Sequence, residues 1–423
     1  MSETDLDCRL ALSASAGNPP VYGARLGPSR ALTPIPTPPS TADAVVVGAG
    51  IVGASCAHFL AEAGLDVVVV ERGAVSSGTT SAGEGNILVS DKDDGPELDL
   101  ALLSRRLWVE IGQRLGDRCE LEAKGGLVVA AAPSTLAALR ARGHGQRESG
   151  VDVVEVAEDE LHDLEPHLAR GLAGGALYPQ DMQVQPMLAT ALLLALPRTT
   201  GSVRTLAGCE VVGIDLDGAG AVSGVRTARG SISTRTVVNA AGIGATAIAA
   251  LAGVEVPVLP RRGFILVTEP LPPVIRHKVY SAEYVDNVAS SDAGLETSTV
   301  VEGTRGGTIL IGASRERVGL DPTVDWDVVS VLARKACAVF PFLRDVRLMR
   351  TYSGFRPYCP DHLPVVGGDP RVPGLFHACG HEGAGIGLAP GSGLLVTQAV
   401  LQQDPSIPLA PYRPDRFDGD SHD

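Results

Sequence analysis

The sequence predicts an α/β plus α+β fold, in which a Rossmann-like lobe shares the chain with an antiparallel-sheet lobe. Three observations carry this prediction. Residues 43–70 show a strand–turn–helix–strand pattern about 30 residues long, which is typical of a Rossmann unit. Strand-like and helix-like stretches are mixed through the rest of the chain. The length of 423 residues exceeds one ordinary domain, so two lobes with interleaved segments are expected.

The first unit is the clearest part of the pattern. Asp43–Val47 is a short apolar strand, and the glycine turn after it leads into an alanine-rich helix that runs to Ala63. Gly64 suits the C-cap of this helix, because glycine accepts the left-handed backbone that helix ends often require. Asp66–Val70 contains only valine after its aspartate, which indicates a second buried strand.

The later elements follow from the same periodicities. Helices are expected over Glu97–Leu115, Pro186–Leu196 and Val328–Phe340. Strands are expected over Leu127–Ala131, Glu210–Ile214, Thr236–Asn239, Phe264–Thr268 and Thr308–Ile311. The stretch Leu375–Gly391 should form a strand, a glycine-rich loop and the start of a helix after Pro390.

Composition narrows the functional classes. The net charge of −14 argues against nucleic acid or an anionic membrane as a partner, since both require a basic surface. No apolar run is long enough to span a membrane. The seven cysteines are scattered and form no C-x-x-C, which argues against an iron–sulfur cluster or another metal site in this chain. Reduced thiols fit a cytoplasmic protein.

The N-terminal region has a different composition from the rest. Residues 1–40 are rich in Pro, Ser, Ala and Gly and lack periodicity, so a disordered extension is expected. The first residues have neither a positive segment nor a long apolar segment, and they do not resemble a secretory signal.

A nucleotide-binding fingerprint follows the first strand. Its glycines permit the tight turn, the approach of a pyrophosphate to the backbone and close packing of helix on strand, and the helix N-terminus offers free N–H groups to phosphates. Glu71, eighteen residues after Gly53, ends the second strand, where a carboxylate can bind ribose hydroxyls. The motif predicts dinucleotide binding but does not choose between NAD and FAD. The residues of this fingerprint are Gly48-Ala49-Gly50-Ile51-Val52-Gly53.

Four further motifs occur in an order that resembles the D-amino-acid oxidase superfamily over roughly residues 43–410. The first is Gly78–Asn86, which follows Glu71-Arg72-Gly73, and the second is Val237–Gly242. The third combines Gly354-Phe355-Arg356-Pro357 with Asp361–Gly367, and the fourth is Gly380–Pro390. The resemblance implies FAD. It also implies that the Gly380–Gly387 loop faces the flavin N1–C2=O edge, where negative charge gathers on reduction.

The fingerprint and the resemblance together give the expected FAD-binding residues: Gly48, Gly50, Ile51, Val52, Gly53, Glu71, Arg72, Thr79, Thr80, Gly85, Asn86, Val211, Ala240, Gly242, Gly383, Gly385, Ile386 and Gly387. They also imply a Rossmann-like FAD-binding domain with an interleaved antiparallel-sheet substrate domain. The FAD-binding parts are residues 41–125, 183–262 and 346–412, the substrate parts are 126–182 and 263–345, and 413–423 is a flexible tail.

The substrate-side residues are also implied by the resemblance. Arg356 corresponds to the arginine that binds the substrate carboxylate in amino-acid-oxidising relatives, and its planar fork matches a carboxylate bidentately. Tyr280 and Tyr284 lie where some relatives place paired tyrosines against the substrate. His381 is a candidate for a polar residue near the flavin, and so is Glu382, which could equally face solvent.

Covalent attachment of the flavin is not expected. Monomeric sarcosine oxidases link FAD to a cysteine near this region. Counting back from Asp361-His362, that position corresponds to about Ser353 rather than Cys359. The sequence therefore predicts non-covalent FAD.

The resemblance implies oxidation of the C–N bond of a small amino or imino acid of the glycine, sarcosine, proline, hydroxyproline or D-amino-acid type. Among relatives of this kind are glycine and sarcosine oxidases and the FAD subunits of D-hydroxyproline, proline and opine dehydrogenases and of hydrogen cyanide synthase. The chain could act alone as a homo-oligomer, or as a subunit beside an iron–sulfur or second flavin partner. An NAD-dependent dehydrogenase, a flavin monooxygenase and a non-catalytic FAD scaffold remain as alternatives.

Overall fold

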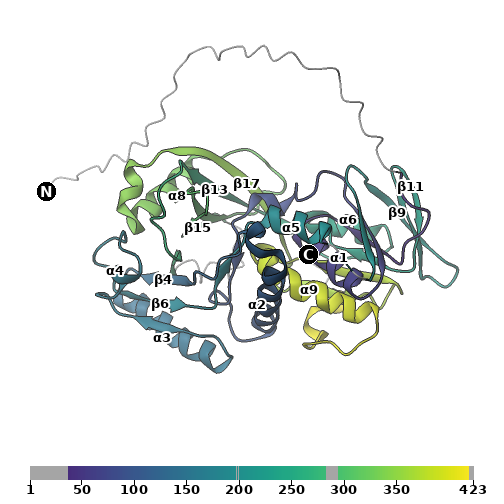
Figure 1. Cartoon of the computed structure of the whole chain (residues 1–423), viewed down its shortest axis with the longest axis horizontal. Helices are drawn as coiled ribbons and strands as arrows, with labels where there is room; N and C mark the ends of the chain where they lie inside the picture. Colours follow the sequence, from purple (N-terminus) through teal and green to yellow (C-terminus); the bar gives the residue numbers. More distant parts are fainter. Residues whose placement is uncertain (1–36, 197, 199, 283–293, 419–423) are drawn as a thin grey trace, which may run out of the picture.

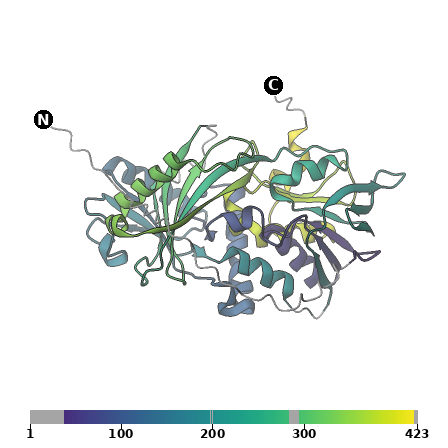
Figure 2. The same ribbon diagram turned by 90° about the horizontal axis from the view of Figure 1, so that it is seen from above.

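The structure is a computed structural model, and it describes residues 37–418 apart from residues 197, 199 and 283–293. The described chain forms two lobes, each built around one large sheet, and they lie side by side in two orthogonal views (Figures 1 and 2). Most of the extension predicted over residues 1–40 lies outside the described residues. Its last residues join the fold, since the carbonyl of Ser40 accepts a hydrogen bond from the amide of Ser233 at 2.9 Å.

The first lobe contains a six-stranded sheet that is parallel except at one edge. β18 pairs antiparallel with β19, and all the other neighbours run parallel. In spatial order the strands are β18 (Val365–Gly368), β19 (Leu375–Cys379), β12 (Val237–Asn239), β1 (Ala44–Val47), β2 (Asp66–Val70) and β8 (Ser202–Leu206).

Burial on both faces explains the valine runs of β1 and β2. Val46 and Val69 belong to the core on one face, and Val45 and Val68 belong to the core on the other. A parallel sheet covered on both sides needs apolar residues at every position. Helices α1 (Ile51–Glu62), α2 (Pro96–Leu115), α5 (Pro186–Ala195) and α9 (Gly385–Val400) contribute to the first core. Helix α6 (Ala245–Ala250) and a three-stranded antiparallel sheet of β9 (Val211–Leu216), β10 (Val222–Thr227) and β11 (Gly230–Ser233) contribute to the second.

The second lobe contains an eight-stranded sheet that is antiparallel except where β4 pairs parallel with β14. Its spatial order is β17 (Leu348–Tyr358), β13 (Leu259–Thr268), β16 (Ile309–Arg315), β15 (Glu296–Gly303), β14 (Lys278–Ser281), β4 (Gly126–Ala130), β6 (Gly174–Tyr178) and β5 (Val154–Val156). Helix α8 (Trp326–Val339) packs on β13, β15 and β16, while α3 (Pro133–Glu148) packs on β4 and β6.

The described part of the chain also contains the short helix α4 (Leu161–Leu164) and the antiparallel pair of β3 (Asn86–Ile87) and β7 (Met182–Gln183). None of the helices in the described part of the chain is long and apolar enough to cross a membrane.

The eight-stranded sheet crosses the expected domain boundaries at two points. The eight-stranded sheet includes β13 from Leu259, before the boundary expected at 262, and the whole of β17, after the one expected at 346. These two strands pair with each other along their length, so the sheet places both in the second lobe. Within the expected tail, Arg416 pairs with Asp361 at 2.6 Å, and Asp418 pairs with Arg371 at 2.6 Å.

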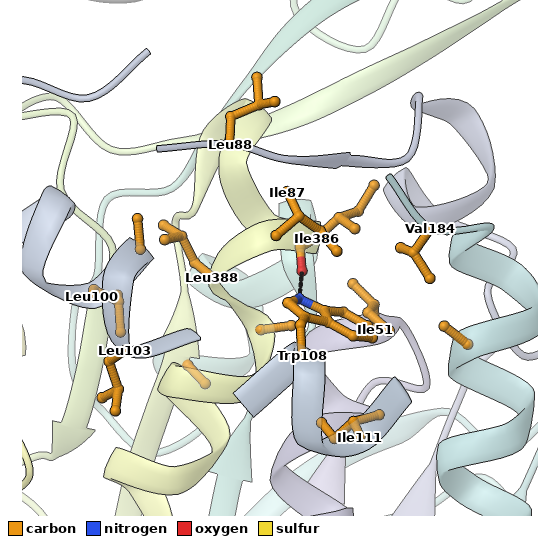
Figure 3. Close-up of a cluster of buried hydrophobic side chains, with 14 of the residues drawn as sticks. Ile51, Ile87, Leu88, Leu100, Leu103, Trp108, Ile111, Val184, Ile386 and Leu388 are labelled. Carbon is orange, nitrogen blue, oxygen red and sulfur yellow. Dashed lines mark hydrogen bonds between the residues drawn. The ribbon is translucent and has the colours of Figure 1, made fainter. Parts of the chain in front are cut away.

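Helix α9 begins at Gly385, five residues before Pro390, although its start was expected after that proline. A proline inside a helix has no N–H for the carbonyl four residues earlier. Here the indole Nε1–H of Trp108 donates to the carbonyls of Ile386 at 3.1 Å and Gly387 at 3.2 Å (Figure 3). The hydroxyl of Ser104, one turn away on α2, accepts from the amide of Gly391 at 2.7 Å. Helix α2 therefore supplies the hydrogen bonds that let α9 continue through Pro390.

Candidate functional site

A cavity of about 440 Å³ lies between the two sheets. Its walls come from both lobes, including the turn after β1, the segment 71–86, and residues of β13, β17 and the loop before α9. Of the expected FAD-binding residues, fifteen line it: Gly48, Gly50, Ile51, Val52, Glu71, Arg72, Thr79, Thr80, Asn86, Val211, Ala240, Gly242, Gly383, Gly385 and Ile386. The cavity thus gathers residues that are far apart in the sequence.

The fingerprint glycines have the tight contacts that their expected roles require. Gly48 has φ +110°, and a Cβ there would lie 2.4 Å from the carbonyl oxygen of Ala240. A Cβ on Gly53 would lie 2.0 Å from the carbonyl oxygen of Gly48. Gly53 therefore holds α1 against the turn and does not itself line the cavity.

The turn also orients Glu71 and the start of α1. The Glu71 carboxylate accepts hydrogen bonds from the amides of Ala49 at 2.9 Å and Gly73 at 2.7 Å. Gly50, at the N-cap of α1, provides no side chain to cap the helix, and the amide of Ile51 donates to the hydroxyl of Thr80 at 3.0 Å. The amide-rich end of α1 consequently opens into the cavity, an arrangement that suits phosphate.

Two other expected residues hold the backbone without lining the cavity. A Cβ on Gly85 would lie 1.8 Å from the carbonyl oxygen of Val184, and a Cβ on Gly387 would lie 3.4 Å from that of Asn86. Both glycines allow close packing of segments that carry cavity residues.

Arg356 lies on β17 with its guanidinium in the cavity wall. Its Nη1 donates to the carbonyl of Ser314 at 2.8 Å, and a Cβ on Gly263 would lie 2.3 Å from the same nitrogen. Its Nε faces Gly383, whose Cβ position is 3.4 Å away. The cation therefore lies between the sheet of the second lobe and the loop before α9.

His381 and Glu382 also line the cavity, but their polar groups are bound to other protein groups. His381 Nε2 lies 2.8 Å from the hydroxyl of Ser392, and burial lowers the pKa of this histidine to about 4, so it is neutral at pH 7. Burial alone would raise the pKa of Glu382. The hydrogen bond to His362 and the charges of Arg315 and Arg261 outweigh burial and lower that pKa to about 2. Glu382 is therefore a structural anion, paired with Arg261 at 2.7 Å.

Tyr280 does not reach the cavity. It is fully buried on β14, and its hydroxyl is hydrogen-bonded to the carboxylate of Asp181 and to Ser90. Burial first, and then the adjacent charge of Asp181, hold the pKa of Tyr280 well above its usual value. The expectation of a substrate contact is corrected for this residue, while Tyr284 lies outside the described residues.

Sequence reasoning missed Glu84, which lies inside the motif Gly78–Asn86 and lines the cavity. Its side chain is only 7% exposed, and one oxygen accepts from the amide nitrogen of Asn86 at 3.2 Å. A charged residue between two glycines of a cofactor-binding turn is the sequence signal that could have identified it.

Cys359 is unsuited to a covalent flavin link. It is fully buried in the second core of the first lobe and does not line the cavity. Burial raises the pKa of its thiol to about 12, so the reactive thiolate is suppressed. Among the residues described, no cluster of three or more side chains is arranged to hold a metal ion.

Comparison with known proteins identifies the family. The family model described as FAD dependent oxidoreductase, DAO, matches residues 43–399. The chain belongs to this family. FAD is therefore the cofactor, which resolves the choice between NAD and FAD that the fingerprint leaves open.

Individual relatives of the family match most of the chain. Glycine oxidase of Geobacillus kaustophilus is 29% identical over 378 residues, 88% of this chain and 96% of that protein. Its crystal structure has a TM-score of 0.79 at 28% identity and covers 89% of this chain and 99% of that one. Hydrogen cyanide synthase subunit HcnC of Pseudomonas aeruginosa is 27% identical over 426 residues, 89% of this chain and 96% of that protein. Human mitochondrial sarcosine dehydrogenase is 28% identical over 410 residues, which are 92% of this chain but only 42% of that protein.

The residues of the cavity fit FAD. The glycine turn and the N-terminus of α1 would hold the pyrophosphate, Glu71 would hold the ribose, and the loop before α9 would contact the flavin. When bound, FAD supplies a two-electron oxidant beside the Arg356 wall of the cavity.

Proposed function

We propose that this enzyme oxidises the C–N bond of a small amino or imino acid, with Arg356 binding the substrate carboxylate. The observation that carries the proposal is the guanidinium of Arg356 in the cavity wall between the second-lobe sheet and the loop before α9. Relatives named for glycine oxidation and sarcosine dehydrogenation support this substrate class. A net charge of −14 would repel a carboxylate, so a local fixed cation is needed to bind it.

The protein groups position the substrate and exclude water. Arg356 fixes the carboxylate, because two parallel hydrogen bonds define both its place and its plane. This places the carbon that bears the nitrogen at a constant position in the cavity, which lowers the entropic cost of reaction. Neutral His381 adds no charge to the cavity wall, and its bond to Ser392 keeps the ring fixed.

An anaerobic titration tests the proposal. Purified protein is mixed without oxygen with glycine, sarcosine, proline, hydroxyproline and D-alanine, and the flavin absorbance is recorded. Bleaching by at least one of them, but not by the matching amine without a carboxylate, is expected. Flavin that no amino or imino acid bleaches would refute the proposal and favour a non-catalytic FAD subunit.

We also propose that FAD is held non-covalently, as the position of Ser353 and the burial of Cys359 suggest. Acid precipitation should release the flavin into the supernatant. Flavin that remains on the precipitate would contradict this proposal.

A second candidate is the same oxidation carried out as one subunit of a complex, because the relative HcnC is named as a subunit. In that case, substrate would bleach the flavin while oxygen would reoxidise it slowly and an artificial acceptor quickly. Rapid reoxidation by oxygen alone would favour an independent oxidase.

A further inference from the structure

Glu84 presents a buried carboxylate to the cavity, and the mechanism above does not use it. Its Oε1 has no hydrogen-bond partner among the described residues, while Oε2 is bound by the side chain of Asn86. A buried carboxylate oxygen without a donor is costly, because the folded protein does not replace its lost hydration. The oxygen therefore needs a donor that the described chain does not itself supply.

The backbone around Glu84 is clamped on both sides. The carbonyl of Gly83 accepts from the Tyr352 hydroxyl at 3.2 Å, which ties it to β17. The carbonyl of Gly85 accepts from the amide of Val184 at 2.9 Å, and Gly85 has no room for a side chain. The direction of the Glu84 side chain is therefore set by two fixed neighbours.

Glu84 and Arg356 contact nearby positions on the same strands of the eight-stranded sheet. The Arg356 guanidinium bonds to Ser314 on β16, and a Cβ on Gly312 of the same strand would lie 2.8 Å from Oε1 of Glu84. On β13, Gly263 faces Arg356, and Ile265 approaches the Cβ position of Gly312 at 3.1 Å. On β13, the two-residue step from Gly263 to Ile265 spans on the order of 6–7 Å.

That spacing matches an α-amino acid with one end at each group. Its nitrogen and its carboxylate share one carbon, so with a hydrogen bond at each end it spans on the order of 6–8 Å. The two protein groups have opposite charges, as the two ends of the zwitterion require.

We propose that Glu84 binds the amino group of an α-amino acid whose carboxylate is held by Arg356, and that it accepts the ammonium proton before oxidation. This inference rests on the proposed function. In the transfer, one N–H bond breaks and one O–H bond forms on Oε1, so the ammonium becomes a neutral amine and Glu84 a neutral carboxylic acid. No electrons are transferred in this step. The neutral amine has a free nitrogen lone pair, which the C–N oxidation would require when FAD is bound.

The surroundings of Glu84 suit a proton acceptor. Burial and the charge of Glu302 raise its pKa, while Lys278, Asn86 and Arg356 act in the opposite direction with a smaller effect. Lys278 and Glu302 form a buried ion pair with each other, and both charges act on Glu84. A raised pKa brings a carboxylate closer to the pKa of the amine from which it takes a proton.

The test uses the FAD-loaded full-length protein with Glu84→Gln, Glu84→Asp and, as the control, Glu148→Gln, whose side chain is 75% exposed at the end of α3. With sarcosine or whichever amino acid bleaches the wild type, Glu84→Gln should lower kcat/KM roughly 100-fold or more, the usual effect of losing a positioned base. Glu84→Asp should recover part of the rate. Propionate, which lacks nitrogen, should perturb the flavin spectrum with a Kd within about threefold of wild type, because only Arg356 binds it.

A pH profile separates a proton acceptor from a merely structural residue. In the wild type, kcat/KM should fall as the pH drops through the raised pKa of Glu84, and this acid limb should vanish in Glu84→Gln. An unchanged limb, a kcat/KM near the wild-type value, or loss of FAD from Glu84→Gln would each overturn the proposal. Failure of every amino acid to bleach the wild type would instead overturn the proposed function.

Discussion

Replacing Arg356 with alanine should remove the carboxylate site and leave the cofactor site intact. Truncating one partner of a buried, hydrogen-bonded charge pair costs about 2–5 kcal/mol. The kcat/KM for a carboxylate substrate should therefore fall roughly 30-fold or more. Arg356→Lys should recover only part of this loss, since one ammonium group cannot make two parallel hydrogen bonds to a carboxylate.

The assay compares sarcosine with dimethylamine, in which the carboxymethyl group on nitrogen is replaced by a methyl group, so that the carboxylate is absent. Dimethylamine should be a poor substrate for the wild type and should change little in the variant. Arg350→Ala is the matched control, because Arg350 lies exposed on the same strand and does not line the cavity. The reasoning is refuted if Arg356→Ala loses FAD, or if its activity falls equally with both amines.

Three further changes test the cofactor turn, the α2–α9 contact and the buried histidines. Gly50→Val should give protein without FAD, because a side chain there would occupy the path of the pyrophosphate. The loss would be seen as a low ratio of flavin to protein absorbance. Gly145→Ala is the control, because a Cβ on Gly145 would meet no atom within 4 Å. Trp108→Phe should leave the Ile386 carbonyl without its donor and cost about 1–3 kcal/mol, seen as a lower urea midpoint; an unchanged midpoint would contradict this. Burial lowers the pKa of both His58 and His381 from 6.5 to about 4. The contribution of the two neutral histidines to the free energy of unfolding should therefore be fully present above pH 6.5 and be lost as the pH drops toward 4. The urea midpoint of the wild type should fall over this pH range. In His58→Gln it should fall less steeply.

The parts of the site that depend on local sequence could be predicted. The turn from Gly48 to Gly53 could be recognised from the spacing of its glycines, and the burial of β2 from the four valines that follow Asp66. The expected helices and strands likewise correspond to elements of the structure within a few residues, because their periodicity is set by local burial.

The parts that depend on distant segments could not be predicted. Tyr280 looked available for substrate, but Asp181, ninety-nine positions away, binds its hydroxyl. Glu84 was given no role from the sequence, and only the approach of Gly312 on β16 shows that it faces the second lobe. The early start of α9 depends on Trp108 of another helix. In each case residues from a remote part of the chain decide the outcome.

The proline in α9 also constrains how this protein can evolve. While Pro390 is present, the chain needs a donor at position 108 and an acceptor at position 104 on a different helix. A mutation of Pro390 to alanine would restore the missing N–H and relieve selection on both positions. The reverse order is disfavoured, since losing Trp108 first would leave the Ile386 carbonyl without its donor, at the cost of about 1–3 kcal/mol expected for Trp108→Phe. The history of substitutions at these three positions should therefore be directional, with changes at 390 preceding changes at 104 and 108.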